Sequence, residues 1–124
     1  KATANLGLTF GRTEGREALD PYAYCDSDWA QCLDTRRSTS GYVVMLNGSA
    51  ISWLSKRQPT VALSSAEAEY VTACFAAQEV QFIRQTLGEL CLLKTRTPTT
   101  IFCDSQSAIH MIGNPTNGLR GPYC

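Results

Sequence analysis

Three acidic residues stand where folding would bring them together. Asp26 follows the apolar run 22–25, and Asp104 follows the apolar run 100–103. Glu69 lies one turn into a segment with helical periodicity. If the two runs are neighbouring parallel strands, both aspartates lie at the carboxyl edge of a sheet, where open α/β folds build their sites. A carboxylate cluster with no histidine nearby suits hard cations such as Mg²⁺, and a pair of such ions supports phosphodiester hydrolysis.

The elements that would position these residues begin with strands. We expect a first strand from residue 20 or 21 to Asp26, followed by a polar loop. Two β-rich runs then flank the turn pair Asn47-Gly48. Asn-Gly between such runs is the strongest short-range hairpin signal. The runs Gly41–Leu46 and Ser49–Leu54 are therefore predicted to form an antiparallel hairpin.

A long helix is predicted between about Ser65 and Leu90. Its entry has Ser64 as N-cap, Glu67 three residues later to complete a capping box, and Leu63 as a hydrophobic staple. Apolar residues then recur at steps of three and four. They are Ala66, Tyr70, Ala73, Ala77, Val80, Ile83, Leu87 and Leu90.

The remaining elements complete a mixed sheet. A fourth strand should end at Asp104, a short helix should run from about Ser105 to Ile112, and a short extra strand is expected over Leu6–Phe10. A crossover through the long helix makes the fourth strand parallel to the first. The predicted fold class is α/β, with strands one to three antiparallel and strand four parallel to strand one.

Composition fits this interpretation without identifying a function. A chain of 124 residues with a formal charge of zero makes one domain and generates no strong global field toward nucleic acid. The apolar runs are too short for a membrane span, and the default setting is cytosolic or nuclear. The six cysteines lack paired C-x-x-C spacing, so we interpret them as buried thiols, against a disulfide scaffold or zinc.

The motifs resemble those of a known family. In chain order they read YCDSDWA at 24–30, RSTSGY at 37–42, AISW at 50–53, SKRQPTVALSSAEAEY at 55–70, and IFCDSQSAI at 101–109, followed by NP at 114–115. Over roughly residues 5 to 115 the chain is similar to the ribonuclease H domain of copia-type (Ty1/copia) LTR-retrotransposon Pol polyproteins.

That resemblance implies a fold, a division of the chain and a reaction. The fold would be the ribonuclease H-like mixed sheet. Residues 1–18 would be a connection from the reverse transcriptase side, 19–115 an incomplete ribonuclease H-like domain, and 116–124 a divergent tail. The intact family hydrolyses the RNA strand of RNA:DNA hybrids during reverse transcription, with two Mg²⁺ or Mn²⁺ ions. Its partners would be the hybrid and the reverse transcriptase domain of the same polyprotein, in a cytoplasmic virus-like particle or the nucleus, with no membrane.

The resemblance also assigns residues, each with a competing structural role. Asp26, Glu69 and Asp104 match the metal ligands, but Asp28 rivals Asp26, and Asp104 would also suit the N-cap of the following helix. Substrate contacts are expected from loop and strand-end residues, against the alternatives of solvated loop and helix cap. They are Arg37, Ser38, Lys56, Arg57, Ser105 and Gln106. Trp29 and Trp53 are interpreted as core residues rather than base-stacking platforms.

The chain also departs from the family. No Asp or Glu follows Asp104, whereas the resemblance implies a fourth carboxylate on a last helix, after a fifth strand. We therefore expect impaired activity. The alternative is a non-catalytic retroelement remnant that at most binds nucleic acid or a partner.

Overall fold

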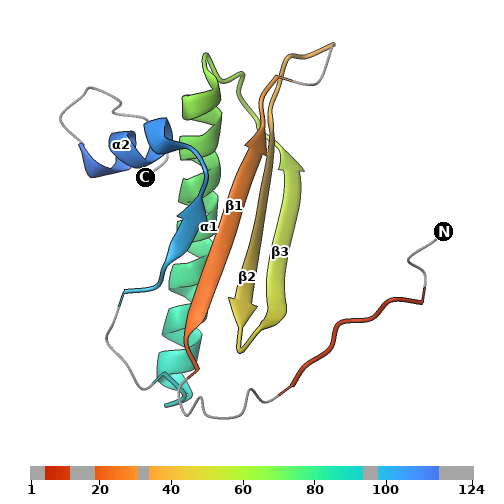
Figure 1. Cartoon of the computed structure of the whole chain (residues 1–124), viewed down its shortest axis with the longest axis vertical. Coiled ribbons are helices and arrows are strands. Elements are labelled where there is room, and N and C mark those ends of the chain that lie inside the picture. The colour runs from red at the N-terminus through yellow and green to blue at the C-terminus, as the bar shows by residue number, and fades with distance from the viewer. Residues whose placement is uncertain (1–4, 12–18, 31–33, 94–97, 115–124) are drawn as a thin grey trace.

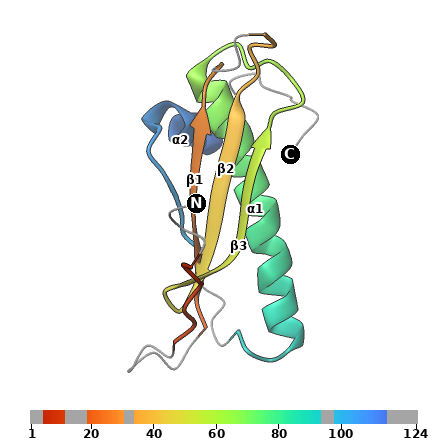
Figure 2. The same ribbon diagram turned by 90° about the vertical axis from the view of Figure 1, so that its right-hand side faces the viewer.

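The computed structural model describes residues 5–11, 19–30, 34–93 and 98–114, and these form a mixed α/β unit (Figure 1). The elements are β1 (Pro21–Asp28), β2 (Thr39–Leu46), β3 (Ser49–Arg57), α1 (Ser65–Glu89), β4 (Ile101–Cys103) and α2 (Gln106–Gly113). The sheet order is β3-β2-β1-β4. Helix α1 lies along one face of the sheet, and α2 lies at the end toward which β1 and β4 point (Figures 1 and 2).

The strand directions confirm the predicted sheet. β1 pairs with β2 and β2 with β3 in the antiparallel sense, whereas β1 and β4 are parallel. The chain reaches β4 from β3 through α1, which is the crossover that a parallel pair requires. The strand ends differ from the prediction, since β1 continues past Asp26 to Asp28 and β3 continues past Leu54 to Arg57.

The β2–β3 hairpin turns at the predicted pair. Asn47 has φ 50° and Gly48 has φ 80°, both in the left-handed region. Two successive left-handed residues are what a type I′ turn needs, because its twist matches that of the flanking strands. The turn chemistry therefore sets the register of the hairpin.

The entry of α1 is capped largely as predicted. Ser64 Oγ accepts a hydrogen bond from Glu67 N (3.1 Å), and Glu67 Oε2 accepts one from Leu63 N (2.6 Å). The staple prediction is wrong, because the Leu63 side chain is 88% exposed. The buried face of the helix mixes small, branched and polar residues. It consists of Ala68, Glu69, Thr72, Ala73, Ala76, Val80, Ile83 and Leu87.

Two hydrophobic clusters join α1 to the sheet. The first lies toward the C-terminal half of α1 and contains Ala23 together with larger side chains, those of Val44, Val80, Ile83 and Leu87. The second lies nearer the N-terminus of α1 and contains Cys25, Ala73 and Ala76. The end of the sheet where β1 and β4 terminate is therefore packed with small residues, which lets the helix approach closely there.

The N-terminal segment does not form the predicted strand. Residues 6–11 have no strand pairing, and the side chains of Leu6, Leu8 and Phe10 are exposed. A hydrogen bond from Ser49 Oγ to Thr9 O (2.9 Å) joins the segment to the start of β3. An alternating apolar pattern needs a neighbouring strand to form a ladder, and none of the described strands pairs with this segment.

Two of the predicted chain divisions depend on residues outside the described ones. The boundary near residue 18 and the tail at 116–124 both lie there. Among the helices that the structure describes, none is long and apolar enough to cross a bilayer.

A buried polar network fixes the first turns of α1 against the hairpin. Gln58 is 1% exposed, and its Nε2 donates to Ser40 Oγ (2.9 Å) and to Ala68 O (3.0 Å). Thr72 Oγ1 lies 2.7 Å from Ser40 Oγ and 2.9 Å from Ala68 O. The backbone N of Gln58 donates to Ser38 O (2.8 Å). One side chain thus links the start of β2, the end of β3 and α1.

Replacing Gln58 by Glu should destabilise the fold strongly. The shape is kept, but the amide donor becomes a carboxylate oxygen that faces the carbonyl oxygen of Ala68, which can only accept. We expect the free energy of unfolding to fall by at least about 3 kcal/mol, because an unpaired charge is buried. Urea unfolding measures it, with the exposed Gln81→Glu as control. A loss below 1 kcal/mol relative to that control would contradict the role of the network.

Candidate functional site

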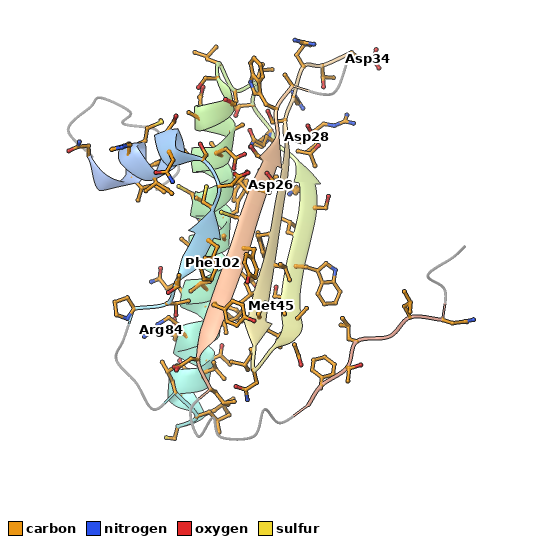
Figure 3. All side chains as sticks on the ribbon, in the orientation of Figure 1. Asp26, Asp28, Asp34, Met45, Arg84 and Phe102 are labelled. Atoms are coloured by element: carbon orange, nitrogen blue, oxygen red, sulfur yellow. The ribbon has the colours of Figure 1, made fainter. Side chains whose placement is uncertain are left out.

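Asp26 and Asp104 occupy equivalent positions at the ends of parallel strands. Cys25 pairs with Cys103 in the β1–β4 register, so the next residue on each strand is one of the two aspartates. Both aspartates are exposed. Figure 3 shows Asp26 near the carboxyl end of β1. The parallel register therefore brings the two predicted ligands to one edge of the sheet.

Glu69 reaches the same edge from α1. Its side chain is only 7% exposed, and Oε1 accepts a hydrogen bond from Ser27 N (3.2 Å), the residue after Asp26. The other oxygen, Oε2, is buried and has no hydrogen-bond partner among the described residues. A buried carboxylate oxygen with no donor is costly unless it binds something.

The electrostatics of Glu69 reflect this position. Burial raises the pKa of its carboxyl above the ordinary value, and the hydrogen bond from Ser27 N opposes that rise. The negative charges of Asp26 and Asp104 raise the pKa of Glu69 further. Both aspartates therefore act on Glu69, and a cation among the three carboxylates would relieve that repulsion.

The tightest cluster of possible ligands is not the predicted trio. Among the described residues, one ligand atom each of Glu69, Cys103 and Asp104 lie within 4.8 Å of one another. Asp26 is not a member of that group. Side chains alternate along a strand, so Cys25 faces α1 and is buried whereas Asp26 is exposed on the other face. The structure thus brings Glu69 and Asp104 together, with Asp26 close enough for its charge to act on Glu69.

Sequence reasoning missed Cys103 as a member of the cluster. A signal was present, because Cys-Asp ends both parallel strands, as Cys25-Asp26 and as Cys103-Asp104. Two identical dipeptides at paired positions put both sulfurs on one face. We interpreted them only as small hydrophobic residues.

Two of the competing roles can now be compared with the structure. Ser105, not Asp104, caps α2, since Ser105 Oγ accepts a hydrogen bond from Ala108 N (3.2 Å). Asp104 is therefore not needed as an N-cap. Asp28 is half-buried, is the last residue of β1 and pairs with Thr39. It lies beyond Asp26 toward the loop (Figure 3).

Comparison with known proteins relates the chain to transposon Pol polyproteins. The chain is 43% identical over 97 residues to the retrovirus-related Pol polyprotein from transposon RE1 of Arabidopsis thaliana, covering 78% of the chain and 6% of that protein. It is 43% identical over 91 residues to the Pol polyprotein from transposon TNT 1-94 of Nicotiana tabacum, covering 73% of the chain and 7% of that protein. Its homologues are copia-type Pol polyproteins. The chain spans less than a tenth of their length.

A shorter relative has a different name. The secreted RxLR effector protein 161 of Plasmopara viticola is 45% identical over 92 residues, covering 71% of the chain and 63% of that protein. No protein-family profile and no solved structure matches the chain.

Basic residues lie at the same end of the sheet as the carboxylates of this Pol-related chain. Arg37, Lys56 and Arg57 are exposed. Thr39 pairs with Arg57 on β3 and with Asp28 on β1, so the ends of the three strands are level. The acidic edge therefore has positive charge two strands away.

The other expected substrate contacts differ in accessibility. Gln106 is exposed at the first turn of α2. Ser105 is half-buried and caps that helix, so its hydroxyl already has a structural role. Ser38 is fully buried, and its Oγ accepts a hydrogen bond from Ala30 N (3.2 Å). Only Gln106 of these three offers a free surface position to a substrate.

None of the four cysteines in the described residues forms a disulfide, and the four differ in burial. Cys25 is buried, its Sγ lies 3.6 Å from Phe102 O, and burial together with the neighbouring Cys103 raises its pKa to about 12. Cys74 and Cys103 are half-buried, and Cys91 is exposed. Cys32 and Cys124 lie outside the described residues.

The sheet face opposite α1 is aromatic and open. Tyr24 stacks on Phe102 with ring centroids 5.0 Å apart, and Tyr22 meets both rings edge-on. The prediction that both tryptophans are core residues is wrong, because Trp53 is 61% and Trp29 46% exposed. Trp29 Nε1 nevertheless donates to Ala62 O (3.3 Å), which ties its ring to the loop before α1.

Glu69→Gln should stabilise the metal-free chain. Because folding raises the pKa of Glu69, the native state binds more protons than the unfolded state, and its stability falls as pH rises from the ordinary glutamate pKa through the raised one. A neutral amide removes that loss, so we expect a gain of about 1 kcal/mol at pH 7 in EDTA.

Chemical unfolding between pH 4 and pH 8 measures this gain, with the exposed Glu89→Gln as control. The advantage of Glu69→Gln should shrink toward pH 4. An equal or lower stability than the original chain at pH 7 would show that the Glu69 carboxylate is not strained by its surroundings.

Proposed function

We propose that this chain is a ribonuclease H module of a retrotransposon Pol polyprotein, which hydrolyses the RNA strand of RNA:DNA hybrids with divalent cations. The observation that carries the proposal is the buried Glu69, with one oxygen unpartnered, between two aspartates at the carboxyl ends of parallel strands. The homology to Pol polyproteins supports it, because such polyproteins are retroelement products.

The topology is consistent with the proposal. Three antiparallel strands, a long crossover helix and a fourth strand parallel to the first occur here in the order expected for a ribonuclease H-like fold. The crossover sets the first turns of α1 over the end of β1, so a residue one turn into the helix meets the strand end. Glu69 occupies that position.

The residues present fit Mg²⁺ or Mn²⁺. Asp26, Glu69 and Asp104 offer oxygen ligands only, and the unpartnered Oε2 of Glu69 supplies an acceptor that no protein donor satisfies. Hard cations of this kind prefer carboxylates and keep several waters. When bound, two such ions would activate a water and stabilise the leaving oxyanion of a phosphodiester.

The protein residues would contribute position and exposure. The Ser27 backbone N–H orients the Glu69 carboxylate, and the hydrogen bond from Gln58 to Ala68 O fixes the helical turn that carries it. Asp26 and Asp104 are exposed, so a phosphate can approach them from solvent. The site is thus held by hydrogen bonds on the helix side and exposed to solvent on the side of the two aspartates.

The hybrid would be held by the neighbouring surface. Arg37, Lys56 and Arg57 can contact phosphates by charge, and Gln106 can donate to backbone or sugar oxygen. Such contacts read the shape of the duplex and the 2′-hydroxyls of RNA rather than the base sequence. We propose the reverse transcriptase domain of the same polyprotein as the source of the hybrid.

The activity of this chain alone is proposed to be low. Positions 105–124 contain no Asp or Glu, so the part of this chain after Asp104 adds no further carboxylate to the site. Stabilisation of the transition state depends on ions held in fixed positions.

A non-catalytic module is the second candidate. The observation that favours it is the relative named as a secreted effector, which matches over 92 residues and is itself much shorter than the Pol polyproteins. Such a module would keep the fold and bind nucleic acid or a partner without cleavage. A cleavage assay separates the two candidates.

Cleavage of a labelled RNA:DNA hybrid in Mg²⁺ should be slow but measurable, and faster in a longer Pol fragment that contains the chain. Asp26→Asn and Asp104→Asn should each lower the rate at least about 100-fold, because each removes a cation ligand. Asp34→Asn, an exposed acid in the β1–β2 loop (Figure 3), is the matched control and should keep the rate.

Three results would decide against the enzyme. They are no cleavage by the longer fragment, cleavage that does not need a divalent ion, and rates unaffected by Asp26→Asn. Hybrid binding without cleavage in both chains would favour the non-catalytic module.

A further inference from the structure

The tightest ligand cluster in the described chain contains a sulfur atom. One ligand atom each of Glu69, Cys103 and Asp104 lie within 4.8 Å of one another. Mg²⁺ is a hard cation that selects oxygen ligands, so it would not bind the Cys103 thiol. The cluster therefore has a donor that the proposed magnesium chemistry leaves unexplained.

The position of Cys103 follows from the sheet register. It is the last residue of β4 and pairs with Cys25 of β1, so both sulfurs lie on the α1 face. Cys103 is half-buried and packs against the small-residue cluster of Cys25, Ala73 and Ala76. Its thiol is thus held beside the helix turn that carries Glu69.

The Glu69 carboxylate gives an independent indication of a ligand. Its side chain is more than nine-tenths buried, Oε1 is bonded to Ser27 N, and Oε2 has no partner. A bound cation would stabilise the unpartnered Oε2 of Glu69. A cysteine that packs only as a small hydrophobic residue would not. The exposed Asp104 completes the set from the solvent side.

We propose that Glu69, Cys103 and Asp104 form a site for thiophilic divalent cations such as Zn²⁺, which overlaps the magnesium site and excludes Asp26. Zinc binds Cys sulfur and Asp or Glu oxygen, and zinc sites with three protein ligands complete their coordination with a water. Ligand atoms around a tetrahedral zinc ion lie roughly 3.5 Å apart. Small rotations, above all of the exposed Asp104 side chain, would close the cluster. The Cys103 thiol releases its proton to solvent on binding.

Binding at this site would inhibit the nuclease, and this consequence rests on the proposed function. Glu69 and Asp104 cannot bind both ions at once. The Cys103 sulfur favours Zn²⁺ over Mg²⁺, because thiolates select soft and borderline cations. The cation binding itself does not depend on any nuclease activity.

Cobalt titration of the reduced, metal-free chain tests the binding. Co²⁺ replaces Zn²⁺ and gives a thiolate-to-metal absorption band in the near ultraviolet, which Zn²⁺ should then abolish. The band should be present in the original chain, in the control Cys91→Ser, and in Asp26→Asn. It should be lost in Cys103→Ser, and Glu69→Gln should weaken Co²⁺ binding at least tenfold. Far-ultraviolet circular dichroism checks that each variant folds.

Each other outcome overturns the proposal. If the band survives Cys103→Ser, the thiolate ligand is another cysteine. If the band is lost in Asp26→Asn, the cation binds the predicted set of Asp26, Glu69 and Asp104. If no band forms at millimolar Co²⁺, the chain has no such site. The nuclease assay is read separately. If Mg²⁺-dependent cleavage is absent while the Cys103-dependent band is present, the proposed function fails and the cation site stands.

Discussion

The parallel pairing of β1 with β4 is the constraint on which the site depends. Only three residues of β4 take part, yet the register Cys25 to Cys103 decides that Asp26 and Asp104 follow at the same level. A shift of one residue would turn the β4 side chains to the opposite face and separate Cys103 from Glu69. The 25-residue helix that makes the crossover also delivers Glu69, so one topological choice places all three carboxylates.

Local signals in the sequence were enough for most of the fold. The pair Asn47-Gly48 readily adopts the two left-handed conformations of a type I′ turn, so it predicted the hairpin. Ser64 as N-cap and Glu67 three residues later predicted the residue at which α1 begins. Both signals work within a few residues of chain. The parallel direction of β4 followed from them because a crossover helix leaves few alternatives.

The features that the sequence did not predict correctly depend on contacts between segments that lie far apart in the chain. The segment Leu6–Phe10 has the alternating pattern of a strand, but it pairs with none of the described strands. Leu63 is the residue type that a hydrophobic staple needs, but its side chain is exposed and packs against no apolar surface among the residues that the structure describes. The sequence did not indicate Cys103 as a neighbour of Glu69, because that proximity arises only when β4 and α1 pack together. Gln58 carried no sequence signal as the link between hairpin and helix, because its burial arises from three distant segments meeting.

The two core clusters place the large packing residues and the carboxylates in different parts of the molecule. The large side chains that hold the sheet to α1, such as Val80, Ile83 and Leu87, lie away from the carboxylates, where the packing residues are small. Substitutions at the carboxylates therefore need not touch the residues that maintain the shape. A copy of such a domain that is released from selection can lose its carboxylates and still fold, which leaves a stable scaffold that evolution can adopt for another purpose.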